Sequence, residues 1–201
     1  IAAYMTDAVI DEVAAEHRRG RRLFVGTANL DAQRGVVWNM GEIAASRSPE
    51  RYRLFRRVIL ASCSVPALFP PVVIDAVSGG QPIREVHVDG ATAASLLAIP
   101  PAVTATQTPT ATAAATTDLY LLVNTQLGGD FRLTRGGILS IAGRAMSLGS
   151  ASATREQVTT AYLWSRRAGA DFHLTYIDGD FTGAGPHREF DTAFMRNLYA
   201  Y

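Results

Sequence analysis

The chain has 201 residues, 48% of them hydrophobic and 18% charged, so its length and composition suit one globular domain with a substantial core. All 19 cationic residues are arginine and 18 residues are acidic, and the resulting net charge of +1 argues against a nucleic-acid partner. Cys63 is the only cysteine, which excludes an internal disulfide and a cysteine-built zinc site.

The first part of the chain is expected to form a helix and then a β-hairpin. Apolar residues at three- and four-residue spacing in "YMTDAVIDEVAAEHRR" predict a helix that Gly20 closes. "RLFVGTANL" and "VVWNM" are typical of strands, and "DAQRG" between them has turn chemistry, so residues 22–40 are predicted to form a hairpin. The sequence starts with isoleucine and shows no capping signal ahead of the first helix, so we expect a further N-terminal part.

A second helix and two short strands lead to Asp89. Ser48 and Pro49 supply an expected N-cap and first-turn proline for a helix over "PERYRLFRRVILASCS", which Pro66 stops. "PVVI" and "REVHV" are the predicted strands, joined by the glycine-rich "SGGQP". Asp89 stands where the second strand ends.

The second half of the chain alternates between strand and helix. Residues 98–117 are rich in threonine, proline and alanine and are expected to form an exposed surface loop. "LYLLVNT" is typical of a central strand covered on both faces. A long helix over about 138–167, the strand "DFHLTYI" and an amphipathic terminal helix in "FDTAFMRNLYAY" follow. The alternation predicts an α/β fold.

Asp89 has two possible roles. On a strand, Glu85, His87 and Asp89 share one face while Val86 and Val88 share the other. Asp89 would then lie at the carboxyl end of a strand, the edge at which open α/β sheets place ligands. The alternative is a turn aspartate that bonds its own backbone.

The surroundings of Asp89 resemble patatin-like phospholipases. Asp89, Gly90 and Ala91 match the family's Asp-Gly-Ala motif. The segments "GRRLFVGTANLDAQRGVVWNMGEIA" and "FDTAFMRNLYAY" are similar to a strand pair and the closing helix of that family. The family's Ala-Ser-x-x-x-Pro-x-x-Phe-Pro-Pro run is matched by Ala61, Ser62, Pro66, Phe69, Pro70 and Pro71.

The resemblance implies a three-layer α/β/α fold of which residues 1–201 are the C-terminal portion. It implies a serine–aspartate dyad that hydrolyses acyl esters of lipids, with Asp89 as the general base. It further implies transient contact with a membrane surface and no metal or organic cofactor. Neither the compartment nor the oligomeric state is indicated.

The sequence departs from that family at the nucleophile. No Gly-x-Ser-x-Gly occurs, and the nearest string is "GSASA" at 149–153, in a predicted helix after Asp89. Ser147, Ser150 and Ser152 are therefore interpreted as ordinary helix residues, and the serine is expected in an upstream segment of the same protein. The alternative is a non-catalytic lipid-binding or scaffolding module of the same fold.

Several other side chains have a structural and a functional interpretation. His87 is expected to be structural, because two residues along one strand is poor geometry for an aspartate that orients a histidine. His87 and Glu85 alone are too few ligands for a metal site. His173 and His187 have no partner that the sequence reveals.

Near Asp89, Leu68 and Phe69 either line an acyl pocket or pack in the core, the latter being the plainer interpretation. Cys63 is expected to be a small buried residue. The arginine pairs at 18–19, 21–22, 56–57 and 166–167 fit either phosphate headgroup contacts or solvated helix ends, and we favour the latter.

Overall fold

The computed structural model describes residues 1–66, 68–93, 117–128, 133–134, 136–179, 181 and 191–200. The chain is of mixed α/β class and divides into two compact units, Ile1–Gln107 and Thr108–Tyr201. The surface loop predicted over 98–117 lies outside the described residues except for its last position, and so does His187.

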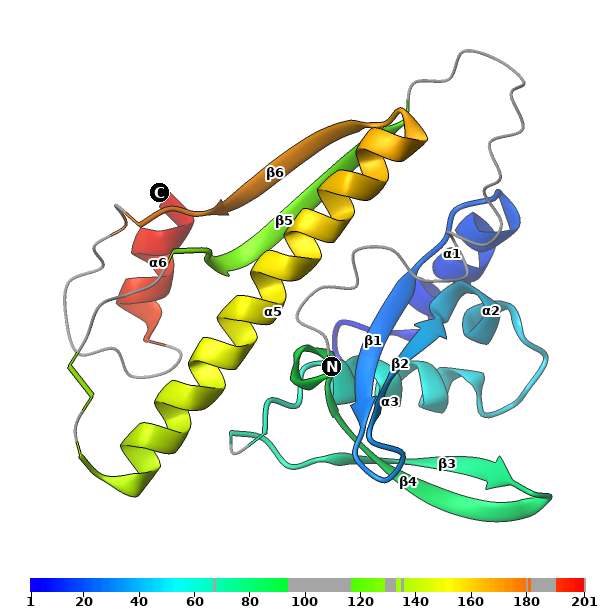
Figure 1. Ribbon diagram of the computed structural model, residues 1–201. Helices are drawn as coiled ribbons and strands as arrows, with labels where there is room; N and C mark the ends of the chain where they lie inside the picture. The colour runs from blue at the N-terminus through cyan, green and yellow to red at the C-terminus, as the bar shows by residue number, and fades with distance from the viewer. Residues whose placement is uncertain are drawn as a thin grey trace. The chain divides into compact units, whose positions relative to one another are not determined.

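The first unit contains a four-stranded antiparallel sheet with the order β2-β1-β4-β3 (Figure 1). Its strands are β1 (Phe24–Asn29), β2 (Arg34–Asn39), β3 (Val72–Ser78) and β4 (Gln81–Asp89). The hairpin predicted over 22–40 is confirmed, with Phe24 paired to Asn39 and Asn29 to Arg34.

A two-residue turn joins β3 to β4. Gly79 and Gly80 occupy it with φ values of 56° and 80°, which glycine adopts without steric cost. Positive φ at both central residues is the requirement of a type I′ hairpin turn. The predicted glycine-rich connection is thereby confirmed.

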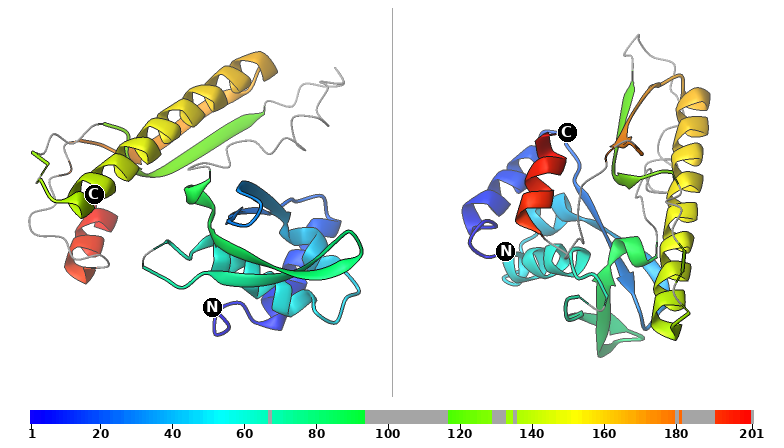
Figure 2. Two further views of the ribbon diagram at one scale, coloured as in Figure 1. Left: turned by 60° about the horizontal axis from the view of Figure 1, so that its bottom comes forward. Right: turned by 90° about the vertical axis from the view of Figure 1, so that its left-hand side faces the viewer.

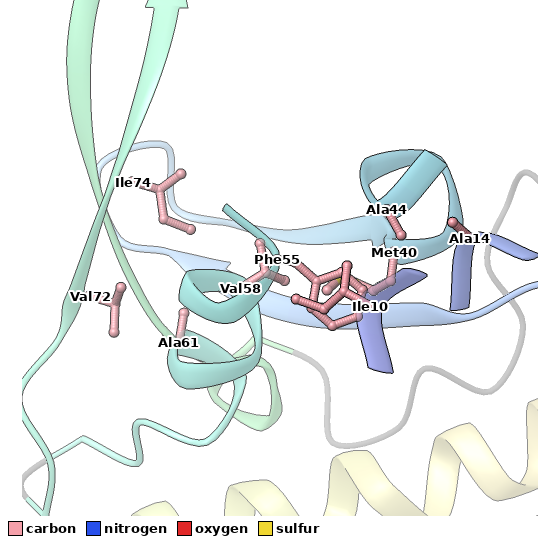
Figure 3. Close-up of a cluster of buried hydrophobic side chains, with 9 residues drawn as sticks. All are labelled: Ile10, Ala14, Met40, Ala44, Phe55, Val58, Ala61, Val72 and Ile74. Atoms are coloured by element: carbon pink, nitrogen blue, oxygen red, sulfur yellow. The ribbon is translucent and has the colours of Figure 1, made fainter. Parts of the chain in front are cut away.

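Three helices cover one face of this sheet, namely α1 (Asp7–Arg18), α2 (Met40–Ala45) and α3 (Arg51–Ser62). Val72 and Ile74 point from β3 towards them, and Phe55 of α3 is 1% exposed. Figure 3 shows the cluster, whose buried members are Ile10, Ala14, Met40, Ala44, Phe55, Val58, Ala61, Val72 and Ile74.

The N-termini of these helices differ from the expected ones. The hydroxyl of Thr6 accepts a hydrogen bond from the Val9 amide at 3.4 Å, so α1 has an N-cap and the expectation of none is wrong. The short helix α2 was not expected, and the Asn39 side chain caps it by accepting from the Glu42 amide at 3.2 Å.

The helix α3 begins at Arg51, two residues later than predicted. The Ser48 hydroxyl accepts from the Glu50 amide at 3.2 Å, and the Ser48 carbonyl accepts from the Arg51 amide at 3.2 Å. Ser48 and Pro49 therefore form a turn ahead of the helix, and their assignment as N-cap and first helical residue is wrong.

The arginine pair at 56–57 lies within α3 and links it to other elements. Arg56 donates to the Met5 carbonyl at 2.7 Å and pairs with Asp7. Arg57 pairs with Asp75 of β3 at 3.3 Å. These two guanidinium groups act as ties within the first unit, so the interpretation of this pair as a solvated helix end is wrong.

The second unit contains a parallel pair of strands, β5 (Asp118–Gln126) and β6 (Asp171–Ile177), connected by the helix α5 (Ile138–Ala168). Figure 2 shows α5 running along the strand pair. Gly169 ends α5 in the left-handed conformation with φ of 68°. The terminal helix α6 (Thr192–Ala200) forms as predicted.

Within the second unit, the described residues cover one face of β5. Leu121 and Val123 are buried, whereas Tyr120 and Leu122, which point to the opposite face, are 66% and 73% exposed. The covered face packs against α5, where Tyr162 meets Phe172 of β6 edge to face at 5.5 Å. The expectation that both faces are covered is thus wrong for the described residues. Among those residues, no helix has the length and apolar character needed to cross a membrane.

Candidate functional site

Asp89 ends β4 at a point where three segments of the first unit meet. Asp89 pairs with Thr27 of β1, and its amide donates to the carbonyl of Ser64 at 3.0 Å, just beyond the end of α3. A short 3-10 turn, Gly90–Thr92, follows, and the Asp89 carboxylate accepts from the Ala91 amide at 2.8 Å. The backbone of Asp89 is therefore held on both sides, while its side chain is half-buried.

The Asp89–Ala91 hydrogen bond is the contact that a turn aspartate makes with its own backbone. The alternative role for Asp89, a turn aspartate that bonds its own backbone, is thereby confirmed. The contact engages one oxygen of a carboxylate that has about four lone-pair positions, so the group retains the capacity to accept a proton.

Residue 90 is a glycine at a position where the backbone of β1 leaves no room for a side chain. A Cβ built on Gly90 would lie 2.6 Å from the carbonyl oxygen and 2.8 Å from the carbonyl carbon of Gly26 in β1. Both neighbours are backbone atoms, so no side chain can swing aside to make room. The turn after Asp89 can pass β1 this closely only because residue 90 has no side chain.

The face of the sheet that carries Asp89 is the one that the helices cover. Directly opposite residues of antiparallel strands share a face, and β4 places His87 opposite Val72 and Glu85 opposite Ile74. His87 is fully buried, so the ionisable side of β4 turns towards the interior of this unit.

A chain of hydrogen bonds accounts for this buried histidine. The indole Nε1 of Trp38 donates to the hydroxyl of Thr27 at 2.8 Å, and that hydroxyl lies 2.9 Å from Nδ1 of His87. On the other side of the ring, Nε2 of His87 is 3.4 Å from Oε2 of Glu85.

The chemistry of the groups assigns the protons. Glu85 as a carboxylate only accepts, so His87 carries its proton on Nε2 and presents the lone pair of Nδ1 to the Thr27 hydroxyl. Thr27 then donates to His87 and accepts from Trp38. Both ring nitrogens of the buried His87 thus have a polar partner, in agreement with the structural role expected for it.

The other predicted site residues near Asp89 are more exposed than expected. After Ser64 the chain forms a turn in which the amides of Leu68 and Phe69 both donate to the Val65 carbonyl, at 3.1 and 3.0 Å. Leu68 is 42% and Phe69 45% exposed, so the interpretation that they pack in the core is wrong. Cys63 is also exposed, contrary to prediction, because it follows the last helical residue.

The remaining candidates lie in the second unit. Ser147, Ser150 and Ser152 are all in α5, as predicted. His173 has two partners that the sequence did not reveal, because it stacks on Tyr120 with ring centroids 4.4 Å apart and approaches Asp118 at 3.1 Å. Within the described part of the chain, no three histidine, cysteine or acidic side chains are grouped so that they could hold a metal ion.

Sequence reasoning missed Thr27 and Trp38. No short sequence pattern around either residue indicates its role, because the pairing of β1 with β2 and β4 is what brings the two side chains next to His87. A correct pairing of these strands would have placed Thr27 opposite Asp89.

Comparison of the chain with protein-family models and with curated proteins finds no match. The resemblance to patatin-like phospholipases therefore rests on the sequence motifs alone.

The first prediction concerns the hydroxyl at the centre of the buried network. Thr27→Val keeps the side-chain shape but leaves the Trp38 N–H and the His87 Nδ1 without a partner. We expect it to lower the free energy of unfolding by about 1–3 kcal/mol. Urea unfolding followed by circular dichroism measures this, with the exposed Thr92→Val as the matched control. Equal stabilities of the two variants would refute the network.

The second prediction concerns the close approach at Gly90. Gly90→Ala is expected to destabilise the protein by about 1–3 kcal/mol, because the added methyl group meets rigid backbone. The control is Gly35→Ala in the same sheet, where the built Cβ finds its nearest neighbour at 3.6 Å, an ordinary contact. A melting temperature for Gly90→Ala that matches the control would contradict the geometry.

Proposed function

We propose that residues 1–201 form the C-terminal portion of a three-layer α/β/α patatin-like domain that hydrolyses acyl esters of lipids, with Asp89 as general base. The observation that carries this proposal is the convergence on Asp89 of three segments that resemble the same family. Asp89 pairs with Thr27 of β1, its amide donates to the carbonyl of Ser64, two residues after "ILAS", and Gly90 packs on Gly26.

The geometry of Asp89 suits the role of a base. A serine hydroxyl is a weak nucleophile until a positioned group accepts its proton. Efficient proton transfer requires the base within about 2.6–3.2 Å of the hydroxyl, which in turn requires a fixed backbone. The bonds to Ser64 and Ala91 provide this, and the half-buried side chain is still accessible.

The reaction would run in two half-reactions with Asp89 as base in each. Asp89 takes the serine proton while the serine oxygen attacks the ester carbonyl, and it returns that proton to the departing alcohol. Water then attacks the acyl-enzyme while Asp89 accepts a proton of the water, and Asp89 passes that proton to the serine oxygen as the acyl–oxygen bond breaks, which releases the fatty acid and the free serine. The serine would come from an upstream segment of the same protein, since no serine of this sequence lies in a Gly-x-Ser-x-Gly elbow.

The apolar residues after Ser64 would contact the lipid. Val65, Leu68 and Phe69 are 37%, 42% and 45% exposed, and they continue directly from the residue whose carbonyl holds Asp89. Exposed apolar side chains gathered in one short segment favour contact with an acyl chain or a membrane surface. The substrate class is accordingly a lipid or other acyl ester.

One observation favours the rival function, a module that binds lipid without hydrolysing it. Among the described residues, the hydrogen bond found for the Asp89 carboxylate is the one within its own turn, to the Ala91 amide. A turn aspartate next to an exposed apolar segment would suffice for binding alone. Activity of the protein with its upstream segment distinguishes the two functions.

The third prediction tests the base. In the protein with its upstream segment, Asp89→Asn should reduce hydrolysis of a short acyl ester by about 10²- to 10⁴-fold, the usual contribution of a general base. The asparagine carbonyl can still accept from Ala91, so the circular dichroism spectrum should not change. Asp171→Asn, an exposed aspartate in β6, is the control and should retain full turnover.

A well-folded Asp89→Asn variant with wild-type turnover would refute the assignment. If the unaltered protein itself binds lipid vesicles but shows no turnover, the non-catalytic module is the correct function.

A further inference from the structure

The first unit contains a cavity to which the proposed function assigns no role. Its volume is about 340 Å³, and cavities of about 300–1,000 Å³ accommodate small-molecule ligands. It lies between α1, the loop that follows α1 and the start of α2, two helices that lie side by side in Figure 1. Its described lining residues all fall within 9–41, a stretch that the structure describes without a gap.

Three apolar side chains line this cavity. Val9 and Val13 are one turn apart on α1 and half-buried, and Leu23, just ahead of β1, is 42% exposed. Covering apolar surface of this kind contributes about 25 cal/mol per Å². The cavity therefore favours a ligand that carries an apolar group.

The two walls approach each other at Gly41, the second residue of α2. A Cβ built on Gly41 would overlap the imidazole ring of His17 in α1, and both residues line the cavity. The ring occupies the space that a side chain at residue 41 would need. This contact sets the spacing between α1 and the start of α2.

Four charged side chains line the cavity, and two of them balance each other. Glu16 pairs with Arg21 at 3.4 Å and also with Arg19, which is not among the lining residues. The hydrogen bond from Arg19 holds the pKa of Glu16 below its usual value, so this carboxylate is ionised at neutral pH. The other two are Glu12 and Arg22, and neither forms an ion pair with a described residue. The lining thus includes one negative and one positive charge that no described side chain of opposite charge neutralises.

Arg22 is oriented by the backbone at the end of α1. Its Nη1 donates to the His17 carbonyl at 3.0 Å and to the Arg21 carbonyl at 2.8 Å. Among the described residues, no partner is found for its Nε and Nη2, which lie on one edge of the guanidinium group. Such an edge can donate to both oxygens of a carboxylate. A guanidinium that is already oriented loses less conformational freedom when it binds.

Glu12 is near enough to Arg22 for one small ligand to contact both. Glu12 and His17 are about 7.5 Å apart along the axis of α1, at 1.5 Å per residue, and Arg22 bonds the His17 carbonyl. The Glu12 side chain is exposed and can turn towards Arg22. Hydrogen bonds from a ligand to the two charged groups take up about 2.8 Å each. The positive and negative groups of the ligand must therefore be close together, as they are when one carbon carries both.

We propose that this cavity binds a free amino acid with an apolar side chain. Nε and Nη2 of Arg22 donate to the α-carboxylate, and Glu12 accepts from the α-ammonium group. The side chain of the ligand covers Val9, Val13 and Leu23. An amino acid is a zwitterion near neutral pH, so it supplies one partner for each of the two unpaired charges.

The test is isothermal titration calorimetry of the 201-residue chain with L-leucine, together with amide NMR spectra that locate the site. Three analogues each lack one group, namely isocaproate the ammonium, isoamylamine the carboxylate and glycine the apolar side chain. L-leucine should bind about tenfold or more tightly than each analogue, since a hydrogen bond to a charged group contributes about 1.5–3 kcal/mol. The amide resonances of Leu23 and Gly41 should shift on titration.

Two variants test the charged groups separately. Arg22→Lys keeps the charge but removes the paired donors, so it should weaken L-leucine binding by about tenfold. Its control is Arg18→Lys, an exposed arginine of the last turn of α1 that is not among the lining residues. Glu12→Gln should weaken L-leucine binding to a similar extent but not that of isocaproate, which has no ammonium group. Its control is Glu42→Gln, at an exposed position outside the lining.

The proposal is overturned if L-leucine does not bind at millimolar concentrations, if any of the three analogues binds as tightly, or if the control variants weaken binding as much as Arg22→Lys and Glu12→Gln. Glu12 has no side-chain partner among the described residues, so Glu12→Gln leaves the fold intact and remains informative if Arg22→Lys alters the end of α1. These readouts do not depend on hydrolysis, so they stand or fall independently of Asp89.

Discussion

The close approach of β1 and β4 at Gly26 and Gly90 is the constraint on which the candidate site depends. A side chain at residue 90 would meet the carbonyl of Gly26 at 2.6 Å, so the strands can continue into this turn only with glycine there. The approach sets the point at which β4 stops and Asp89 leaves the sheet. The bond from the Asp89 amide to Ser64 then fixes the end of α3 against the same point. Three segments separated by many residues of sequence are thereby held around one carboxylate.

The buried polar side chains beside Asp89 follow from the same strand register. Pairing of Thr27 with Asp89 places the Thr27 hydroxyl on the helix-covered face, next to His87. A buried polar group without a partner costs about 1–3 kcal/mol. The sequence of donors and acceptors from Trp38 through Thr27 and His87 to Glu85 avoids this cost. It also disfavours any slip of β1 against β4, which would turn the hydroxyl away from the ring.

Local patterns predicted the elements that local chemistry determines. The hairpin over 22–40, the turn at Gly79 and Gly80 and the long helix over about 138–167 all follow from short-range signals. The antiparallel order of the first sheet and the role of Thr27 depend on pairing between distant strands, which no short window contains. The exposure of Cys63, Leu68 and Phe69 depends on where α3 ends, and a shift of two residues at a helix end reverses such an assignment. The cavity bordered by Glu12 and Arg22 requires the start of α2 to lie beside α1, which the sequence does not indicate.

The central claim is that Asp89 serves a serine that lies upstream of this chain. Fluorophosphonate labelling followed by intact-mass measurement and peptide mapping tests it most directly, applied to the 201-residue chain and to the protein with its upstream segment. We predict no adduct on the chain alone and a single adduct on an upstream serine in the longer protein. A stoichiometric adduct on Ser147, Ser150, Ser152 or any other serine of the 201 residues would contradict the claim, and the assignment of Asp89 as its base would fall with it.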